Sequence, residues 1–462
     1  MEFSKKETIA YGLGAIGKDM CYALSAGYVL YYYQDLLHLP GTFVGFVLMA
    51  ARIFDAINDP FMGVLVEGTN TKWGKFRPWI LGGTILNAIV LFALFAAPDL
   101  GLRGLKFYMS IIYILWGVTY TMMDIPYWSM IPAVTSNARD REHLSVVGRS
   151  CAGVGNALIT VLTPVLVGVL GGANERMGFK WYGLIVAVIF VIAEVILFKT
   201  IKETQSNEKM KTTSVREMFS ALFRNDQAMV TVAAILLINT ALYLTSNLII
   251  YFFKYDVGGE AWRGNFSLFN MVGGAAQILS MMILYPQLRK HKKNEDIFKI
   301  CLCMSMSGYA LILLISVLGL AHNMALLCLC GLLVFAANGM LTVLTTVFLS
   351  NTVDYGQLKT GHREESVIFS MQTFVVKAAS GVAVFLAGLG IDLIGLVGNT
   401  NDEAVVAAQS SSTILGLRLL MTILPIIGLV LALVLFIKKF KLTDQRVEEI
   451  TAELNGAGGE GE

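Results

Sequence analysis

The sequence predicts an all-α membrane protein with twelve transmembrane helices, and three observations support this fold class. The chain of 462 residues is 56% apolar and 15% charged, whereas soluble domains contain about 45 to 50% apolar and about 25% charged residues. Its mean hydropathy is +0.66. Apolar stretches of about 20 residues, which cross a bilayer as one helix, recur along the chain. No stretch between them is long enough for a soluble domain.

The predicted spans follow one another with short polar connections. They lie at residues 9–33, 42–67, 79–98, 106–131, 146–171, 179–198, 229–253, 265–286, 297–318, 323–350, 366–396 and 413–437. The longest connection follows the sixth span and divides the chain into halves. We therefore expect an N-terminal six-helix bundle at 1–199, a cytoplasmic middle loop at 200–226, a C-terminal six-helix bundle at 227–441 and a cytoplasmic tail at 442–462.

Positive charge predicts the orientation of the spans. One set of loops and termini carries 24 Lys and Arg residues and the opposite set carries six. Cytoplasmic loops are the positive ones, so we expect both termini in the cytoplasm of a bacterial inner membrane protein. The polar start MEFSKKET and the long first span are not typical of a cleaved signal peptide.

A weak internal repeat supports the division into halves. Arg141-Glu142 precedes the fifth span, and Arg363-Glu364-Glu365 precedes the eleventh span 222 positions later. Two pseudo-symmetric six-helix repeats are typical of the major facilitator fold, in which substrate binds near the membrane midplane between the halves. We predict that fold here.

Several function classes find no support in the residues. The formal net charge is +2, and no basic run interleaved with aromatic residues suggests nucleic-acid binding. Gly12–Gly17 matches GxGxxG without a preceding strand, so we interpret it as helix packing. No nucleophile and base pair, P-loop or HExxH motif predicts an enzyme. The cysteines lack disulfide or metal spacing and are interpreted as packing residues: Cys21, Cys151, Cys301, Cys303, Cys328 and Cys330.

Charged residues inside the predicted spans are the main functional signal. Each costs about 2.5 to 3.5 kcal/mol on insertion scales, so such residues face an interior cavity or a partner. Five basic residues remain outside the loop count, and four carboxylates lie at comparable depth in the N-terminal half. Without Arg418, this set has four basic and four acidic residues and is formally neutral. They are Lys18, Arg52, Arg149 and Lys377, and Asp19, Asp55, Asp59 and Asp124.

The second span contains a candidate cation site. Asp55, Asn58 and Asp59 occupy positions i, i+3 and i+4, so their oxygens leave one face of the helix. Oxygen ligands are the ones that small hard cations prefer. The alternative is a packing network in which Arg52 and a lysine neutralise the two acids.

The fourth span contains a candidate sugar site. Tyr120, Thr121, Asp124 and Trp128 lie at i, i+1, i+4 and i+8, close to one face. A carboxylate near aromatic rings suits a sugar, because hydroxyl groups need acceptors and the C–H face packs on a ring. Thr121 offers a hydroxyl to the cation site. For Trp128 alone, the alternative is a marker of the membrane interface.

Basic residues on other spans would complete the polar site. Lys18 and Asp19 lie in the first span and Arg149 in the fifth, where a guanidinium can orient carboxylates. Lys377 in the eleventh span follows Gln372 and Thr373 by about a turn. We interpret Lys377 as a sensor of the bound cation; its alternative is a lysine that reaches the membrane surface.

Five runs of residues resemble the glycoside-pentoside-hexuronide cation symporters. They are ARIFDAINDP at 51–60, KWGKFRPW at 72–79, YTMMDIPYW at 120–128, NTVDYG at 351–356 and QTFVVK at 372–377. The resemblance covers the whole chain. It implies twelve helices and cotransport of an α-galactoside such as melibiose with Na⁺, Li⁺ or H⁺.

The resemblance also implies site residues. Its cation site, with Na⁺ at Asp55 and Asp59, comprises Asp55, Asn58, Asp59 and Thr121. Its sugar site comprises Lys18, Asp19, Tyr120, Asp124, Trp128, Arg149, Gln372, Thr373 and Lys377. Its cytoplasmic gate comprises Arg141, Glu142, Arg363 and Glu365. This sequence departs from the family pattern at Thr342, where a tryptophan is expected, and at Asn351, where an aspartate is expected.

We therefore expect a secondary active symporter that takes up a galactoside with a monovalent cation, and that needs no other cofactor and no obligate protein partner. One alternative is a symporter for another glycoside, a pentoside or a glucuronide. A glucuronide would bring a carboxylate next to Asp19 and Asp124. A lysolipid carrier on the same fold is a further alternative.

Overall fold

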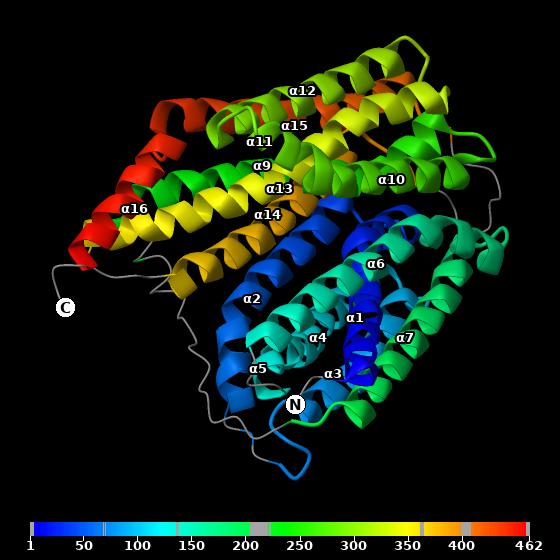
Figure 1. The fold of residues 1–462 in the computed structure, drawn as a ribbon. Helices are drawn as coiled ribbons and strands as arrows, with labels where there is room; N and C mark the ends of the chain where they lie inside the picture. Colours follow the sequence, from blue (N-terminus) through cyan, green and yellow to red (C-terminus); the bar gives the residue numbers. More distant parts are fainter. Residues whose placement is uncertain are drawn as a thin grey trace. The chain divides into compact units, whose positions relative to one another are not determined.

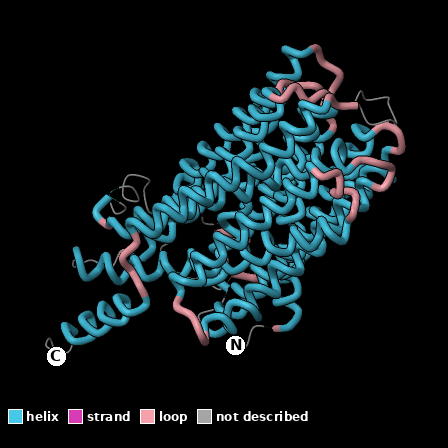
Figure 2. The backbone as a smooth tube through the Cα atoms, turned by 90° about the horizontal axis from the view of Figure 1, so that it is seen from above, coloured by secondary structure: helices cyan, strands magenta, loops and turns pink. Residues whose placement is uncertain are grey.

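The computed structural model describes residues 4–67, 69, 71–134, 138–203, 220, 223–360, 365–398 and 408–458. Within these ranges the chain is helical and forms no strand (Figure 2). The helices of the first half are α1 (Lys5–Tyr31), α2 (Gly41–Glu67), α3 (Arg77–Phe95), α4 (Leu102–Ser129), α5 (Ile131–Val134), α6 (Ala138–Gly171) and α7 (Glu175–Thr200), with the π-helix η1 (Tyr32–Leu36) after α1.

The second half continues the same pattern. Its helices are α9 (Asp226–Tyr251), α10 (Trp262–Leu279), α11 (Tyr285–Arg289), α12 (Asn294–Val317), α13 (Met324–Thr360), α14 (Glu365–Leu393), α15 (Ser411–Lys439) and α16 (Asp444–Gly458), with π-helices η2 (Phe252–Val257) and η3 (Ser280–Leu284). Every predicted span falls on one of the long helices, so the predicted all-α fold is confirmed. The helix α16 lies within the predicted tail at 442–462.

Two helices are longer than their predicted spans. The helix α6 begins at Ala138 rather than near 146, and α13 continues to Thr360 rather than ending near 350. Hydropathy detects only the apolar part of a helix. The helix itself continues into polar sequence as long as its backbone groups form i to i−4 hydrogen bonds. The added turns are the polar ends of these helices.

Ten helical segments of the described chain are long and apolar enough to cross a membrane. The two predicted spans missing from this set are those of α1 and α4. These two helices carry Lys18, Asp19 and Asp124. Charged side chains lower the mean hydropathy of the helices that hold them.

Two compact units emerge from the contacts of the chain. Unit 1 comprises Met1–Thr212 with Gly258–Ser267 and Ile391–Gln409, and unit 2 comprises Thr213–Val257, Leu268–Gly390 and Ser410–Glu462. In unit 1, α1 packs against α6 and α7, α3 packs against α4 and α7, and α2 packs against α4 (Figure 1). In unit 2, α9 packs against α13 and α15, and α12 packs against the same two helices. The predicted bundle boundaries stay a prediction.

Glycines allow the close packing of α1 in unit 1. A Cβ atom at Gly17 would lie 2.8 Å from the Ala193 Cβ of α7, and one at Gly155 of α6 would lie 2.5 Å from the Ile16 carbonyl oxygen. Small residues let helix backbones approach in a membrane, where hydrophobic burial does not drive helix association. Because Gly12, Gly14 and Gly17 all face α6 or α7, the structure confirms the interpretation of GxGxxG as helix packing.

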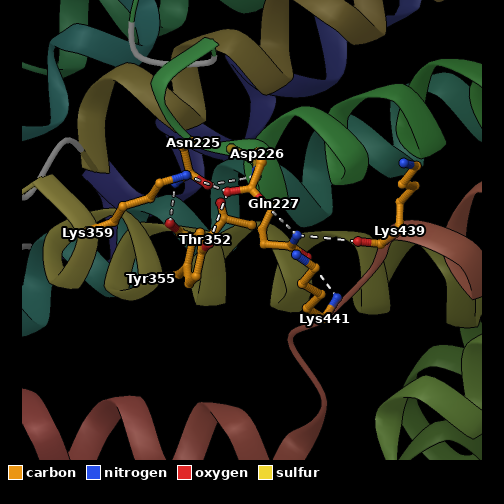
Figure 3. Close-up of polar contacts among 9 residues, drawn as sticks. Asn225, Asp226, Gln227, Thr352, Tyr355, Lys359, Lys439 and Lys441 are labelled. Carbon is orange, nitrogen blue, oxygen red and sulfur yellow. Dashed lines mark hydrogen bonds and ion pairs between the residues drawn. The ribbon is translucent and has the colours of Figure 1, made fainter.

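A side-chain network joins two segments of unit 2, the start of α9 and the end of α13 (Figure 3). The Asn225 Oδ1 atom accepts a 2.9 Å hydrogen bond from the Ala228 amide and caps α9, while Asn225 Nδ2 donates to the Thr352 carbonyl of α13 at 2.7 Å. Asp226 accepts from Tyr355 at 2.9 Å and from Lys359 at 2.7 Å. These bonds connect the start of α9 to the polar end of α13.

Gly155→Ala should destabilise unit 1, because its methyl group would meet backbone atoms of Ile16 that cannot move alone. We expect a cost of roughly 1 to 3 kcal/mol, as for other overpacked sites, measured as a lower apparent Tm in detergent. The matched control is Gly153→Ala on the same helix, since a Cβ at Gly153 has no neighbour within 4 Å. Equal Tm values for the two variants would contradict the packing argument.

Asn225→Ala should lower the stability of unit 2 by about 1 to 2 kcal/mol, because it removes a helix cap and leaves the Thr352 carbonyl without its donor. Asn225→Asp keeps the capping oxygen and loses only the donor, so its apparent Tm should lie between those of Asn225→Ala and the unchanged protein. Thermal unfolding in detergent checks this order, and a reversed order would argue against the cap.

Candidate functional site

A buried lysine is the centre of the candidate site in unit 1. Lys18 is 2% exposed in α1. Its Nζ atom lies 2.8 Å from the Asp19 carboxylate and 2.7 Å from the Asp124 carboxylate of α4. A buried ammonium requires paired charges and satisfied hydrogen bonds. This contact therefore holds α1 and α4 at a set separation.

Aromatic rings surround the Lys18 ammonium. Its Nζ atom lies 5.0 Å from the ring centroid of Trp128, 5.3 Å from that of Tyr127 and 5.9 Å from that of Tyr120. Such cation–π contacts contribute more when the cation is desolvated. The rings thus form an apolar wall around a charged centre.

Two tyrosines fix the register between α1 and α4. The rings of Tyr11 and Tyr127 stack with centroids 4.6 Å apart. The Tyr127 hydroxyl donates to the Tyr11 carbonyl at 2.6 Å, and the Tyr11 hydroxyl donates to the Tyr127 carbonyl at 3.3 Å. This reciprocal pair, which sequence reasoning missed, positions Trp128 one residue further along α4.

Arg149 of α6 completes the donor and acceptor set. Its guanidinium lies 4.2 Å from the Trp128 ring centroid, and the residue is exposed. The side chains of Asp19 and Asp124 are 20% and 31% exposed. Lys18, Asp19, Asp124 and Arg149 are formally neutral together. The group offers two accessible carboxylates, a guanidinium and an indole face, which suits a neutral polyhydroxylated ligand.

The candidate cation site lies where α2 packs against α4. Asp55 is 6% exposed and Thr121 is 5% exposed. The Thr121 hydroxyl donates to the Asp59 carboxylate at 3.5 Å. A Cβ atom at Gly117 of α4 would lie 2.5 Å from the Asp55 Oδ1 atom, so only glycine leaves room for this carboxylate.

The side-chain amide of Asn58 is a further candidate ligand for the cation. Within the described chain, its buried Nδ2 atom has no hydrogen-bond partner. The oxygen and nitrogen of an amide are exchangeable in assignment, and the opposite assignment would aim an oxygen into the same space. Two carboxylates, an amide and a hydroxyl provide the oxygen ligands that a small monovalent cation would take.

The site does not have the composition of a transition-metal centre. Among the described residues, no group of three or more His, Cys, Asp or Glu side chains is placed to hold a metal ion. The six cysteines are free thiols.

Arg52 is buried, with 7% of its surface exposed, and lies beside two aromatic rings. Its guanidinium is 5.0 Å from the ring centroid of Tyr22 and 5.7 Å from that of Trp116. These two rings are further site neighbours that the sequence analysis did not identify.

Three predicted sugar-site residues lie in unit 2. Gln372 and Lys377 of α14 are half-buried and Thr373 is exposed. Their approach to the acids of unit 1 stays a prediction. Thr342 is one of the two departures from the family pattern. Its hydroxyl donates a 2.9 Å hydrogen bond to the Asn338 carbonyl of its own helix.

The predicted cytoplasmic gate is only partly within the described chain. Arg141 and Glu142 belong to the first turns of α6 and Glu365 begins α14, but their side chains lie outside the described residues. Arg363 lies outside the described residues altogether. The gate stays a prediction.

One charged residue of unit 1 was missed by the sequence analysis. Glu194 of α7 is 0% exposed and lies close to Gly14 of α1. The available signal was a lone carboxylate inside the sixth predicted span. Such a residue is by default a candidate for function.

The chain is similar in sequence to known transport proteins. A family described as MFS/sugar transport protein matches residues 10–444. The raffinose carrier protein of Pediococcus pentosaceus is 27% identical over 466 residues, covering 96% of this chain and 71% of that protein. The lactose permease of Lactobacillus helveticus is 28% identical over 495 residues, covering 99% and 74%. The inner membrane symporter YicJ of Escherichia coli (strain K12) is 28% identical over 468 residues, covering 98% and 95%.

Solved structures show the same fold. A crystal structure of the nucleoside transporter NupG has a TM-score of 0.67 at 13% identity, covering 94% of this chain and all of that one. A bacterial homologue of the lysosomal transporter Spinster has the same TM-score and identity, with 94% and 97% covered. At this identity the likeness concerns the fold alone. The predicted major facilitator fold is confirmed.

Gly117→Ala should weaken the candidate cation site, because the added methyl group displaces the Asp55 carboxylate. Displacing one ligand should raise the half-saturating Na⁺ concentration roughly tenfold, in the range seen when supporting residues of metal sites are changed. Na⁺ titration of the purified protein, followed by tryptophan fluorescence, measures this. Gly82→Ala on α3 is the control, since a Cβ there has no neighbour within 4 Å. Equal Na⁺ responses would argue against Asp55 as a ligand.

Proposed function

This chain belongs to the MFS/sugar transport protein family, and on that premise we propose that it couples the inward flow of Na⁺ to the uptake of a galactoside such as melibiose by alternating access. The coarser activity follows from the family: the chain is a multi-pass membrane sugar transporter and not an enzyme. Li⁺ or H⁺ as coupling ion, an inner membrane location and cytoplasmic termini belong to the proposal.

Two observations support a galactoside as the transported substrate. The relatives are named for raffinose and lactose, and both of these sugars contain a galactosyl unit. The residue runs around Asp55, Asp124 and Lys377 resemble those of melibiose permease. A glucuronide is disfavoured, because its carboxylate would approach Asp19 and Asp124, which already share one lysine.

The observation that carries the proposal is the Lys18 cluster. Lys18 fixes two carboxylates that remain partly exposed, and Trp128 presents an indole face beside them. Sugar hydroxyls can donate to those carboxylates and accept from Arg149, while the apolar face of the ring packs on Trp128. Charge-assisted hydrogen bonds of this kind supply both strength and orientation.

One helix connects the two candidate sites. Gly117, Thr121, Asp124 and Trp128 of α4 follow at i, i+4, i+7 and i+11, so they form a stripe along one face. The first two contact the acids of α2, and the last two belong to the sugar cluster. A cation that draws Asp55 and Asp59 together would shift this stripe.

Thermodynamic linkage then supplies the coupling. If a bound cation raises the affinity for sugar, the sugar raises the affinity for the cation by the same factor. We propose that Lys377 responds to cation binding, and that only the empty and fully loaded forms change their access. One charge moving through the membrane potential supplies about 2.3 kcal/mol per 100 mV, or about 50-fold sugar accumulation.

The decisive experiment is uptake of radiolabelled melibiose into right-side-out membrane vesicles under a sodium gradient, a proton gradient alone or no gradient. We expect accumulation that requires Na⁺. Accumulation with the proton gradient alone would replace Na⁺ by H⁺. No uptake by folded protein under any gradient would reject melibiose, and competition by other glycosides or by a lysolipid would then identify the substrate class.

Asp59→Cys should abolish sodium-driven accumulation, because it removes one of the two carboxylates that we assign to Na⁺. Energy-independent exchange of sugar should persist, since Asp59 is outside the Lys18 cluster. Asp296→Asn on α12, where the carboxylate is 52% exposed, is the control and should accumulate sugar normally. Sodium-dependent accumulation by Asp59→Cys would show that the coupling assignment is wrong.

A further inference from the structure

Glu194 is a buried carboxyl group that the sugar and cation sites do not use. It lies in α7, is 0% exposed, and both of its carboxyl oxygens lack a hydrogen-bond partner among the described residues. Burying a charged carboxylate without a partner is much less favourable than burying the neutral acid. The geometry therefore favours the form that carries a proton.

The donors around Glu194 are already engaged. A Cβ atom at Gly14 would lie 3.3 Å from Glu194 Oε1 and 3.2 Å from the Tyr127 ring, so the carboxyl group lies where α1, α4 and α7 meet. The nearby hydroxyls of Tyr11 and Tyr127 donate to each other's carbonyl groups. Neither tyrosine donates to Glu194.

The charged groups that interact electrostatically with Glu194 belong to the Lys18 cluster. They are Lys18, Asp19 and Asp124. In the described structure Lys18 bonds to both aspartates, and neither Glu194 oxygen accepts a hydrogen bond from its ammonium. Gly14 and Lys18 are one turn apart on α1, which places the lysine within the electrostatic reach of the carboxyl group.

We infer that Glu194 is a proton-binding site, separate from Asp55 and Asp59, and that it is coupled to sugar binding through Lys18. Loss of the proton, which water accepts, creates a carboxylate with no donor but Lys18. The lysine is then drawn from Asp19 and Asp124, and the two acceptors for the sugar lose their common anchor. By linkage, bound sugar raises the proton affinity of Glu194.

The coupling to sugar binding rests on the proposed function, whereas the proton site at Glu194 does not. Lys18, Asp19, Asp124, Tyr11 and Tyr127 are the titratable groups that face Glu194 from α1 and α4. On α7 itself, the next carboxylate is Glu175, at the start of the helix and bonded to Arg263. A pH effect that disappears with Glu194 alone can therefore be assigned to it.

The test is calorimetric titration of the purified full-length protein with melibiose at saturating Na⁺, from about pH 6 to about pH 9, in two buffers of different ionisation enthalpy. We expect melibiose affinity to fall at least tenfold toward high pH, with uptake of protons on binding. Glu194→Gln should bind melibiose as the unchanged protein does at low pH, with no dependence on pH and no proton uptake. Glu7→Gln, which changes a carboxylate in the first turn of α1, should behave like the unchanged protein.

The same pH dependence in Glu194→Gln and the unchanged protein would overturn the inference. A second measurement uses no sugar: infrared difference spectra between low and high pH should show a protonated carboxyl C=O band that Glu194→Gln removes. If folded protein binds no melibiose at any pH, the proposed function fails and this band decides the proton site. A missing band in the unchanged protein would overturn the site even if melibiose binds.

Discussion

The pairing of a buried ammonium with two carboxylates is the constraint on which the rest of unit 1 depends. Lys18 cannot remain charged inside the protein unless acids and rings surround it, and the structure supplies Asp19, Asp124 and three aromatic side chains. Because Asp124 is on α4, satisfying this charge also sets the position of that helix. The binding groups of α4 are thus placed by an electrostatic requirement of α1.

Close packing makes that pairing possible. In a membrane, helices associate through van der Waals contact and hydrogen bonds, since lipid is as apolar as the helix surfaces. Gly17 and Gly155 bring α1 against α7 and α6, and the reciprocal bonds of Tyr11 and Tyr127 join α1 to α4. The resulting packing places several unlike charges close together in unit 1, as a coupled binding site would require.

The sharing of α4 between two sites gives coupling a physical route. A rigid helix transmits a displacement at Thr121 to Asp124 within one turn. Along one stripe of α4, the candidate cation-site positions Gly117 and Thr121 precede the candidate sugar-site residues Asp124 and Trp128. Glu194 extends the same logic to a third helix, because its ionisation would compete for the lysine that anchors the sugar acceptors. In this view the cluster has no net formal charge when it is empty, and each ligand that binds or leaves changes the interactions among its charges.

The sequence by itself determined the all-α class, the positions of the long apolar helices and the shared face of Asp55, Asn58 and Asp59, because span length and helical periodicity are local properties. The tertiary structure decided which acid on another helix pairs with Lys18 and that Gly117 makes room for Asp55. It also decided that, among the described residues, no group hydrogen-bonds to the Glu194 carboxyl oxygens. Helices surrounded by lipid and by other helices are apolar on both sides, so hydropathy does not specify their rotation or register. Contacts between helices depend on both, and Asp124, which is 106 residues from Lys18, became its partner only through packing.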